Sequence, residues 1–157
     1  RVKKQTLNKY VKNMLENWKY RKIIISFFYL VILYGLSWYA DSLGLFGDFI
    51  WMSPAFHMSG GFLVAYFVLV LYKTFWSKGI AKIKPKNLLF IFIIAITTLV
   101  GVFWEFYEYL IDYFLAADYQ ITIGDTLMDL FMDIVGSILF CLLYFAKSRL
   151  KLTESSK

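Results

Sequence analysis

Residues 88–114 read LLFIFIIAITTLVGVFWEFYEYLIDYF, and this stretch decides the class of the protein. It carries no charged side chain before Glu105 and contains no lysine or arginine. A continuous apolar run of about 20 residues or more is typical of a helix that crosses a lipid bilayer. Because this run is longer than one crossing needs, we expect the helix to tilt or to project beyond the membrane.

Three further apolar runs accompany this one, at residues 23–40, 55–76 and 125–146. Hydrophobic residues make up 60% of the 157-residue chain, whereas soluble domains average roughly 45–50%. The sequence therefore predicts an all-α polytopic membrane protein. We expect a four-helix transmembrane bundle that forms one membrane domain over residues 23–146.

The positive charges predict the orientation of this bundle. All 17 lysines and arginines lie in residues 1–22, 73–86 and 147–157, so that each gap between these segments holds two apolar runs. Basic segments stay on the cytoplasmic side of a membrane. We therefore expect a multi-pass protein of the cell (plasma) membrane with both termini in the cytoplasm. The net charge of +6 then reflects topology and contact with anionic lipids, and no nucleic acid partner is predicted.

Residues 1–22 form the first basic segment, and residues 147–157 form a basic cytoplasmic tail. Leu7, Val11, Met14 and Trp18 recur at helical spacing, which predicts an N-terminal amphipathic helix on the cytoplasmic leaflet. A frayed basic tail is the alternative interpretation. The apolar run that follows is longer than the core of a usual signal peptide, so we interpret it as a retained span.

The first outer loop, residues 41–53, is unusually apolar. It contains the aromatic stretch from Phe46 to Trp51, and we expect it to lie in the membrane interface or to fold back onto the helices. Ser53 and Pro54 then resemble a helix N-cap followed by proline at the first helical position. The second span is predicted to begin there.

The acidic residues are the most informative feature for function. Nine of the 11 lie in the outer loops or in the outer halves of the last two spans. Six of these nine form two sets, namely Glu105, Glu108 and Asp112, then Asp125, Asp129 and Asp133. At about 100° per residue, the first set fits within an arc of about 60° and the second within about 80°. Each span therefore carries one acidic stripe.

The depth of the acidic stripes restricts where they can face. Along a helix, Asp133 lies about 12 Å below Asp125, and Glu105 about 10 Å below Asp112. An ionised carboxylate at that depth costs several kcal/mol unless it faces a cavity or a cation. We therefore expect the two stripes to face the bundle interior and each other.

His57, the only histidine, begins the second span at the same side of the membrane. Gly60 and Gly61 follow it by one helical turn and allow a close approach of another helix. Gly101 and Gly136 share the faces of the two acidic stripes. His57 and both stripes are therefore expected to converge near the outer leaflet.

No lysine or arginine is available there to offset the carboxylates. A metal ion, protons or a cationic substrate must do so. Oxygen ligands with one imidazole suit Mg²⁺, Mn²⁺ or Ca²⁺, whereas zinc usually takes more histidine or cysteine. The predicted ligands are His57, Glu105, Glu108, Asp112, Asp125, Asp129 and Asp133. The alternative is that the acids are protonated and hydrogen-bond between helices, with Asp125 as an ordinary helix N-terminal acid.

These residues also carry a family resemblance. It rests on HMSGG at residues 57–61, WEFYEY at 104–109, Gln120, DTLMD at 125–129 and DIVG at 133–136. The order resembles the bacterial YjdF-like membrane proteins, an uncharacterised group. It is more distantly similar to VanZ-like proteins, which are linked to resistance against glycopeptide antibiotics, although no arginine precedes the Asp-rich span here. The resemblance covers residues 54–136 and implies a bundle of four to five spans.

Three functions are compatible with this pattern. The first is a metal-dependent hydrolase or transferase acting on a lipid or cell-envelope molecule, with His57, Glu105 and Asp129 in catalytic roles. The second is a small protein that binds or transports protons or a cation. The third is a structural subunit of a membrane complex that contacts its partner through the aromatic loop. Membrane lipids are the expected partners, and assembly into a homo-oligomer stays open.

Overall fold

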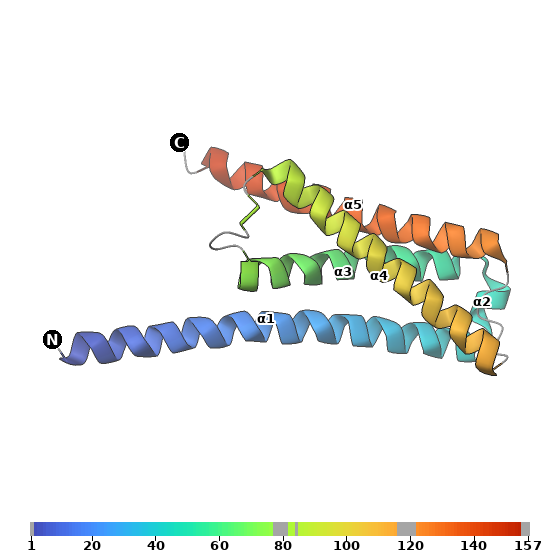
Figure 1. Ribbon diagram of the computed structural model, residues 1–157, viewed down its shortest axis with the longest axis horizontal. Coiled ribbons are helices and arrows are strands. Elements are labelled where there is room, and N and C mark those ends of the chain that lie inside the picture. Colours follow the sequence, from blue (N-terminus) through green and yellow to red (C-terminus); the bar gives the residue numbers. More distant parts are fainter. Residues whose placement is uncertain (1, 77–81, 84, 116–121, 155–157) are drawn as a thin grey trace.

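The computed structural model describes residues 2–76, 82–83, 85–115 and 122–154, and its helices are labelled in Figure 1. They are α1 (Val2–Ser42), α2 (Leu45–Asp48), α3 (Met52–Leu71), α4 (Lys86–Leu115) and α5 (Ile123–Glu154). A π-helical turn, η1 (Tyr72–Trp76), extends α3. The described residues contain no strand.

Four helices are long and apolar enough to cross a membrane. These segments are Tyr20–Ser42, Met52–Trp76, Lys86–Leu115 and Ile123–Lys147, with mean hydropathies between 1.7 and 2.3. Large apolar side chains such as Phe28, Phe103 and Leu127 are exposed on the outside of the bundle, as expected for surfaces that contact lipid. The predicted all-α polytopic membrane bundle is confirmed.

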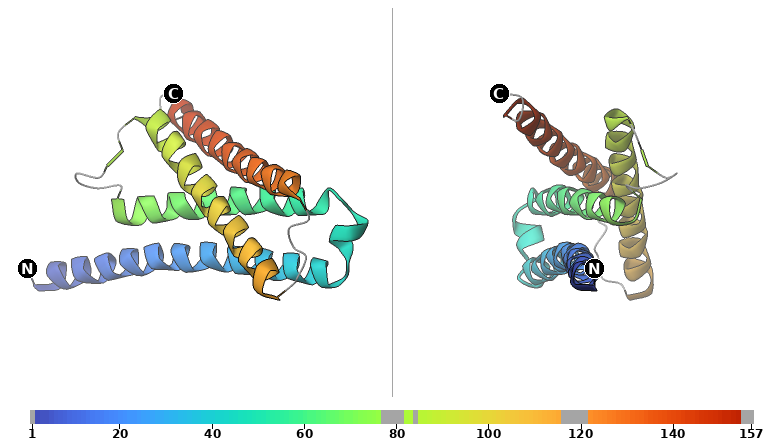
Figure 2. Two further views of the ribbon diagram at one scale, coloured as in Figure 1. Left: turned by 45° about the vertical axis from the view of Figure 1, so that its right-hand side comes forward. Right: turned by 90° about the vertical axis from the view of Figure 1, so that its left-hand side faces the viewer.

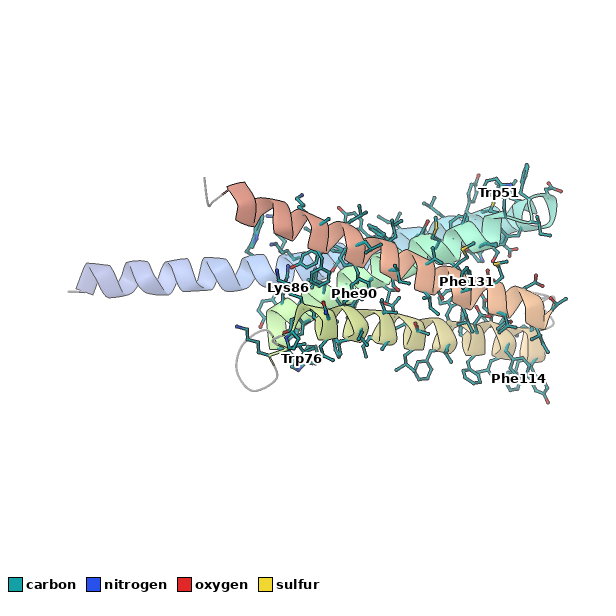
Figure 3. All side chains as sticks on the ribbon, turned by 90° about the horizontal axis from the view of Figure 1, so that it is seen from above. Trp51, Trp76, Lys86, Phe90, Phe114 and Phe131 are labelled. Carbon is teal, nitrogen blue, oxygen red and sulfur yellow. The ribbon has the colours of Figure 1, made fainter. Side chains whose placement is uncertain are left out.

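The two ends of the bundle differ in character. Both chain termini lie at one end, together with Trp76 and Lys86 (Figures 1 and 3). We call it the basic end, because the described parts of the three lysine- and arginine-containing segments lie there. The opposite end carries α2, Trp51 and Phe114, and we call it the acidic end (Figure 3). A tryptophan near each end agrees with the aromatic belts found at membrane interfaces.

The N-terminal segment differs from the prediction in one respect. Residues 2–22 are helical, but they continue directly into the first span as part of the 41-residue helix α1. The segment contains no glycine or proline, so nothing in the sequence interrupts helix propagation at the junction. Residues 2–22 therefore do not form a helix separate from the first span, and α1 extends past the rest of the bundle (Figure 1).

The loop after α1 folds back onto the bundle. The turn at Gly44 has a left-handed backbone with φ of 73°, which glycine adopts without strain. The short helix α2 follows, and the rings of Phe46 and Phe56 pack edge to face at 5.7 Å. The tip of the loop remains open, since Ile50 and Trp51 are exposed. The loop therefore covers the acidic end of α3 with aromatic side chains. This is the folded-back arrangement, one of the two that the sequence predicts.

Helices α3 and α5 form the closest pair in the bundle. A Cβ atom on Gly61 would overlap the main chain of Asp133, and one on Gly136 would overlap the main chain of Met58. Glycine at both positions lets the two backbones touch, as small residues do in membrane helix pairs. Helix α4 crosses this pair diagonally (Figures 1 and 2).

The half of the bundle nearer the basic end has an apolar core. Ala65, Leu69, Ile93, Phe140 and Cys141 are buried there in one cluster formed by α3, α4 and α5. The buried carboxylates Glu105, Asp129 and Asp133 all lie in the other half. The bundle therefore has an apolar half and a polar half, and the polar half is at the acidic end.

Candidate metal centre

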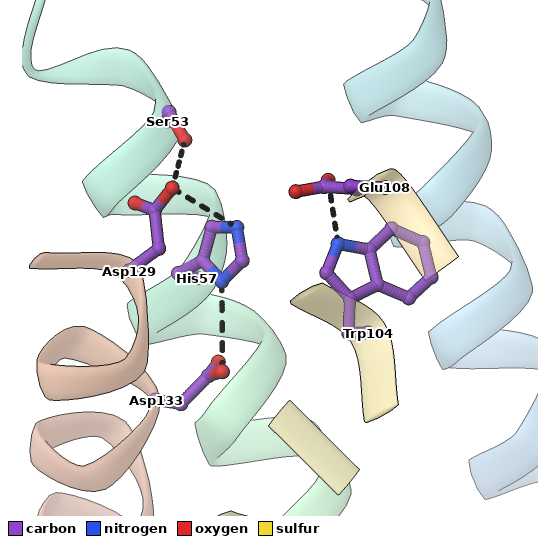
Figure 4. A network of polar contacts seen from close by, with 6 residues as sticks. All are labelled: Ser53, His57, Trp104, Glu108, Asp129 and Asp133. Carbon is purple, nitrogen blue, oxygen red and sulfur yellow. Dashed lines mark hydrogen bonds and ion pairs between the residues drawn. The ribbon is translucent and has the colours of Figure 1, made fainter. Parts of the chain in front are cut away.

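His57 lies between two carboxylates of α5. Its Nε2 is 3.5 Å from Oδ2 of Asp129, and its Nδ1 is 3.5 Å from Oδ2 of Asp133 (Figure 4). The two aspartates are four residues apart and so occupy the same helix face one turn apart. Each ring nitrogen therefore faces a different aspartate, and both aspartates are less than 10% exposed. The imidazole is held between two successive turns of α5.

Glu105 of α4 completes a compact group with His57 and Asp129. One ligand atom from each residue lies within 4.8 Å of the other two. Ligands on opposite sides of an ion at about 2.4 Å are about 4.8 Å apart, so the three atoms are close enough to share one ion. Glu105 is only 6% exposed. Three helices that are distant in sequence thus bring an N,O,O donor set to one point.

Ser53 has a different role from the predicted one. The N-cap of α3 is Trp51, and α3 begins at Met52, so Ser53 already lies in the first turn. Its hydroxyl group donates a hydrogen bond to Oδ2 of Asp129 at 3.0 Å. The prediction of an N-cap was therefore wrong, because α3 begins one residue before Ser53 and the hydroxyl group donates to a carboxylate on α5. Ser53 instead fixes the orientation of Asp129.

Glu108 lies across a gap from His57, on the α4 side (Figure 4). The indole Nε1 of Trp104, one turn earlier on α4, donates a hydrogen bond to Oε1 of Glu108 at 2.7 Å. Such a short bond holds the carboxylate in one orientation. Glu108 is thus part of the acidic region but not of the compact group that contains His57 and Glu105.

The two outermost acids of the stripes lie apart from the compact group. Asp125 is exposed in the first turn of α5, where it accepts a hydrogen bond from the Thr122 hydroxyl at 2.8 Å. Its own backbone N–H donates to the same hydroxyl at 3.3 Å. This arrangement is a helix N-terminal cap and matches the alternative interpretation of Asp125. Asp112 is half-buried near the end of α4.

Gly101 allows the acid at the bottom of the site to reach α4. A Cβ atom at Gly101 would overlap the carboxylate of Asp133. Any larger residue there would push this carboxylate away from His57. The expectation that Gly61 allows a close approach of another helix is confirmed, and Gly101 and Gly136 allow similar contacts on the acidic faces of α4 and α5.

A pocket of about 270 Å³ opens beside the histidine, between α1, α3 and α4. Its polar lining comes from Ser37, Ser53, His57, Thr97, Glu108 and Asp133. Its remaining lining is mostly apolar or aromatic and comes from Leu30, Leu33, Phe46, Phe56, Val64, Val100 and Trp104, among others. Sequence reasoning missed the contribution of α1, because the apolar run at 23–40 contains no charged residue to mark it.

Thr97 is a second residue that the sequence did not single out. It is 1% exposed and lines the pocket one turn below Gly101. Among the residues that the structure describes, its hydroxyl group has no hydrogen-bond partner. The neighbouring Thr98 instead donates to the Ile94 carbonyl at 2.9 Å. Nothing in the sequence distinguishes the two threonines, since only packing decides which one faces the pocket.

Comparison with known proteins identifies the family to which the chain belongs, but the description of that family gives no function. Searches of curated proteins and of solved structures found no match. The model of one family, described as a predicted membrane protein, matches residues 6–149. Gln120, one of the residues behind the predicted resemblance, lies outside the described residues. The match covers nearly the whole chain and the family includes YjdF, so the chain belongs to the DUF2238 family of predicted membrane proteins.

Proposed function

We propose that this protein is a metal-dependent membrane enzyme whose divalent ion is held by His57, Glu105 and Asp129. The observation that carries the proposal is the convergence of these three side chains from α3, α4 and α5, with their ligand atoms within 4.8 Å of one another. A set of three ligands on rigid helices leaves coordination positions for water or substrate. The pocket beside His57 provides the space for that substrate.

The donor set agrees with a hard divalent cation. Two carboxylates favour Mg²⁺, Ca²⁺ or Mn²⁺, and one imidazole is best tolerated by Mn²⁺ among these. Zinc remains the less favoured candidate, because two of the three donors are oxygen atoms. An ion of this kind would supply Lewis-acid polarisation of a phosphoryl or carbonyl oxygen.

The neighbouring side chains support the three ligands. Ser53 orients Asp129 through its hydrogen bond, and Asp133 faces the second ring nitrogen of His57. A carboxylate on the second nitrogen of a metal-binding histidine fixes the ring orientation and raises its basicity. In this proposal Asp133 is a positioning residue rather than a ligand.

We further propose that the basic end faces the cytoplasm and that the site serves the outer leaflet. The segregation of lysine and arginine supports this orientation. A substrate at that depth is a lipid or a lipid-linked envelope molecule. The more distant similarity to VanZ-like proteins stays part of this proposal and agrees with an envelope substrate.

Transport is less well supported. A cation path to the basic end would have to cross the cluster of Ala65, Leu69, Ile93, Phe140 and Cys141, which are all buried and apolar. In the described part of the chain, the buried carboxylates lie on one side of this cluster. An enzyme needs no such path, whereas a carrier does.

The first experiment measures bound metal by elemental mass spectrometry on protein purified in an uncharged detergent. Wild type is compared with Glu105→Gln and Asp129→Asn, and Asp112→Asn and Asp125→Asn serve as controls with the same change of charge. We expect near-stoichiometric metal in wild type and both controls, and its loss in the two ligand variants. Wild type without metal after supplementation with Mn²⁺, Mg²⁺, Ca²⁺ and Zn²⁺ would reject the proposal.

A second measurement addresses the enzyme. Lipid extracts incubated with metal-loaded protein are analysed for products by mass spectrometry, with and without a chelator. Products that depend on metal and are absent with Glu105→Gln support catalysis. Uptake of a cation into vesicles without any lipid product would instead favour transport.

A further inference from the structure

The pocket beside His57 has two unlike walls. Helix α1 contributes Leu30 and Leu33, whereas the opposite side carries His57, Glu108 and Asp133. A Cβ atom placed on Gly60 would come within 3.9 Å of both Leu33 and Asp133, so the apolar and acidic walls approach each other there. A ligand in this pocket therefore meets hydrocarbon on one side and carboxylates on the other.

The polar groups of the pocket select the charge of the ligand. Neither lysine nor arginine is among the lining residues that the structure describes. The carboxylates of Glu108 and Asp133 accept hydrogen bonds but donate none when ionised. An anionic head group would be repelled from this wall, and a cationic group would be attracted.

The aromatic lining adds to this preference. Tyr34, Phe46, Phe56 and Trp104 all line the pocket. The rings of Tyr34 and Trp104 meet edge to face at 5.5 Å. Aromatic faces attract ammonium groups and are the usual recognition elements for alkylated amines. The hydrogen bond from Trp104 to Glu108 joins an aromatic ring and an acid in one unit.

The charge balance of the whole site points the same way. Glu105 and Asp129 belong to the compact group, and a divalent ion there would offset their charge. Glu108 and Asp133 also face the pocket, and Asp133 lies 3.5 Å from Nδ1 of His57. Without such an ion, a protonated His57 would offset only one of the four carboxylates. The preference for a cationic ligand therefore does not depend on the proposed metal.

Thr97 gives an independent indication that the pocket accommodates a ligand. Its hydroxyl group is buried in the lining of the pocket, without a hydrogen-bond partner among the described residues. The hydroxyl groups of Ser59, Thr74 and Thr98 each bond the carbonyl one turn earlier. A buried polar group without a partner costs about 1–3 kcal/mol, and an N–H of a primary ammonium group in the pocket can supply that partner.

Two of the helices that line the pocket, α1 and α4, are held together mainly by side chains. Helices α1 and α4 make little backbone contact, and aromatic side chains join them. The hydroxyl groups of Tyr34 and Tyr107 are 3.4 Å apart, and both side chains are more than 40% exposed. A side-chain contact of this kind opens by rotamer changes without unpacking helices.

We propose that the pocket binds the ammonium head group of a membrane amphiphile, which enters sideways between α1 and α4. The ammonium lies against Glu108, Asp133 and the ring of Trp104. The hydrocarbon chain lies against Leu30 and Leu33 of α1 and extends outward through the Tyr34–Tyr107 contact into the bilayer. If the proposed enzyme activity holds, this amphiphile belongs to its substrate class.

The test is photolabelling in maltoside micelles, which carry no charge. The probe is a 12-carbon primary alkylammonium with a diazirine in mid-chain, and the matched control is the alkyl sulfate of the same chain. We expect the ammonium probe to label residues of the pocket lining on α1 or α4. Labelling at the pocket should exceed that by the sulfate about tenfold. Equal labelling by the two probes would overturn the proposal.

Variants separate this site from the proposed metal centre. Glu108→Gln is expected to weaken the ammonium probe about tenfold, as for loss of a charged partner, while bound metal is unchanged. Asp112→Asn carries the same change of charge on the same helix and should leave labelling unchanged. Unchanged labelling in Glu108→Gln would overturn the proposal even if metal is present. Selective labelling in a protein that holds no metal would support it while rejecting the metal centre.

Two further measurements test the head group and the entry route. Unlabelled lipids with ethanolamine or choline head groups should compete with the probe, whereas phosphatidylglycerol should not. Tyr107→Ala should increase the initial rate of labelling, because it removes the contact with Tyr34 between α1 and α4 without changing a residue of the pocket lining. Competition by phosphatidylglycerol alone would overturn the ammonium assignment, and an unchanged rate in Tyr107→Ala would overturn the lateral route.

Discussion

Gly61 of α3 lies directly against the main chain of Asp133 on α5, with no room for even one carbon atom between them. This contact places the first turns of α3 beside the acidic face of α5. His57 is one turn before Gly61, and it is therefore within 3.5 Å of both Asp129 and Asp133. The close approach of two backbones is what creates the site.

Gly61→Ala is accordingly expected to destabilise the bundle. The added methyl group overlaps main-chain atoms, which cannot rotate away, and overpacking of this kind costs about 1–3 kcal/mol or more. Thermal unfolding in detergent, followed by circular dichroism, should show a lower midpoint. Gly35→Ala is the matched control, since no atom lies within 4 Å of its added carbon. Equal midpoints for the two variants would contradict the close packing of α3 on α5.

Ser53→Ala should weaken metal binding without shortening α3. The hydroxyl group holds Asp129 at 3.0 Å, and loss of a residue that orients a metal ligand typically lowers affinity about 10–100-fold. Metal affinity is measured by competition with a coloured chelator, and helix content by circular dichroism. Ser59→Ala is the control, because that hydroxyl group bonds the Ala55 carbonyl of its own helix. An unchanged affinity with reduced helix content would restore the capping role.

Thr97→Val should be neutral or stabilising in the absence of ligand. The substitution replaces a buried hydroxyl group that lacks a partner among the described residues with a methyl group of similar shape, and such replacements are nearly neutral or favourable. Thr98→Val removes a hydrogen bond to Ile94 and is expected to be slightly destabilising, by about 1 kcal/mol. The two unfolding midpoints give the comparison. A larger loss for Thr97→Val would mean that its hydroxyl group is satisfied in the native protein.

The proposed orientation predicts the location of fused reporters. Green fluorescent protein joined after Lys157 should fluoresce, because both termini are expected in the cytoplasm. Alkaline phosphatase joined at the same point should be inactive, since it requires export. The reciprocal result would invert the membrane topology and place the pocket toward the inner leaflet.

Much of the fold could be predicted because its signals are local. Apolar length identifies each span, and the four predicted segments agree with the four membrane-spanning helices to within a few residues. The N-terminal segment shows the limit of such signals. Periodicity indicated a helix over residues 1–22 but could not show that it continues into the first span, since continuity depends on the lack of a helix-breaking residue at the junction.

The site was predicted in part. Helical periodicity placed six acids on two stripes. Periodicity does not show how far along a helix a site extends, so Asp112 and Asp125 were grouped with the other four acids. The structure separates them by depth, because Asp125 joins Thr122 in the cap of α5. Ser53, Trp104 and Thr97 were assigned to local roles or not noticed. Their contacts or position in the pocket depend on the packing of different helices and on which face of a helix meets the pocket.

The sequence by itself determined that the chain forms membrane-spanning helices and that the deepest acids, Glu105 and Asp133, face inward, because an ionised carboxylate exposed to lipid costs several kcal/mol. Tertiary structure alone decided which acids meet His57. That choice depends on crossing positions, which are set by glycine contacts such as those of Gly61 and Gly136. A contact between two helices depends on the surfaces of both, so it cannot be predicted from the sequence of either helix alone.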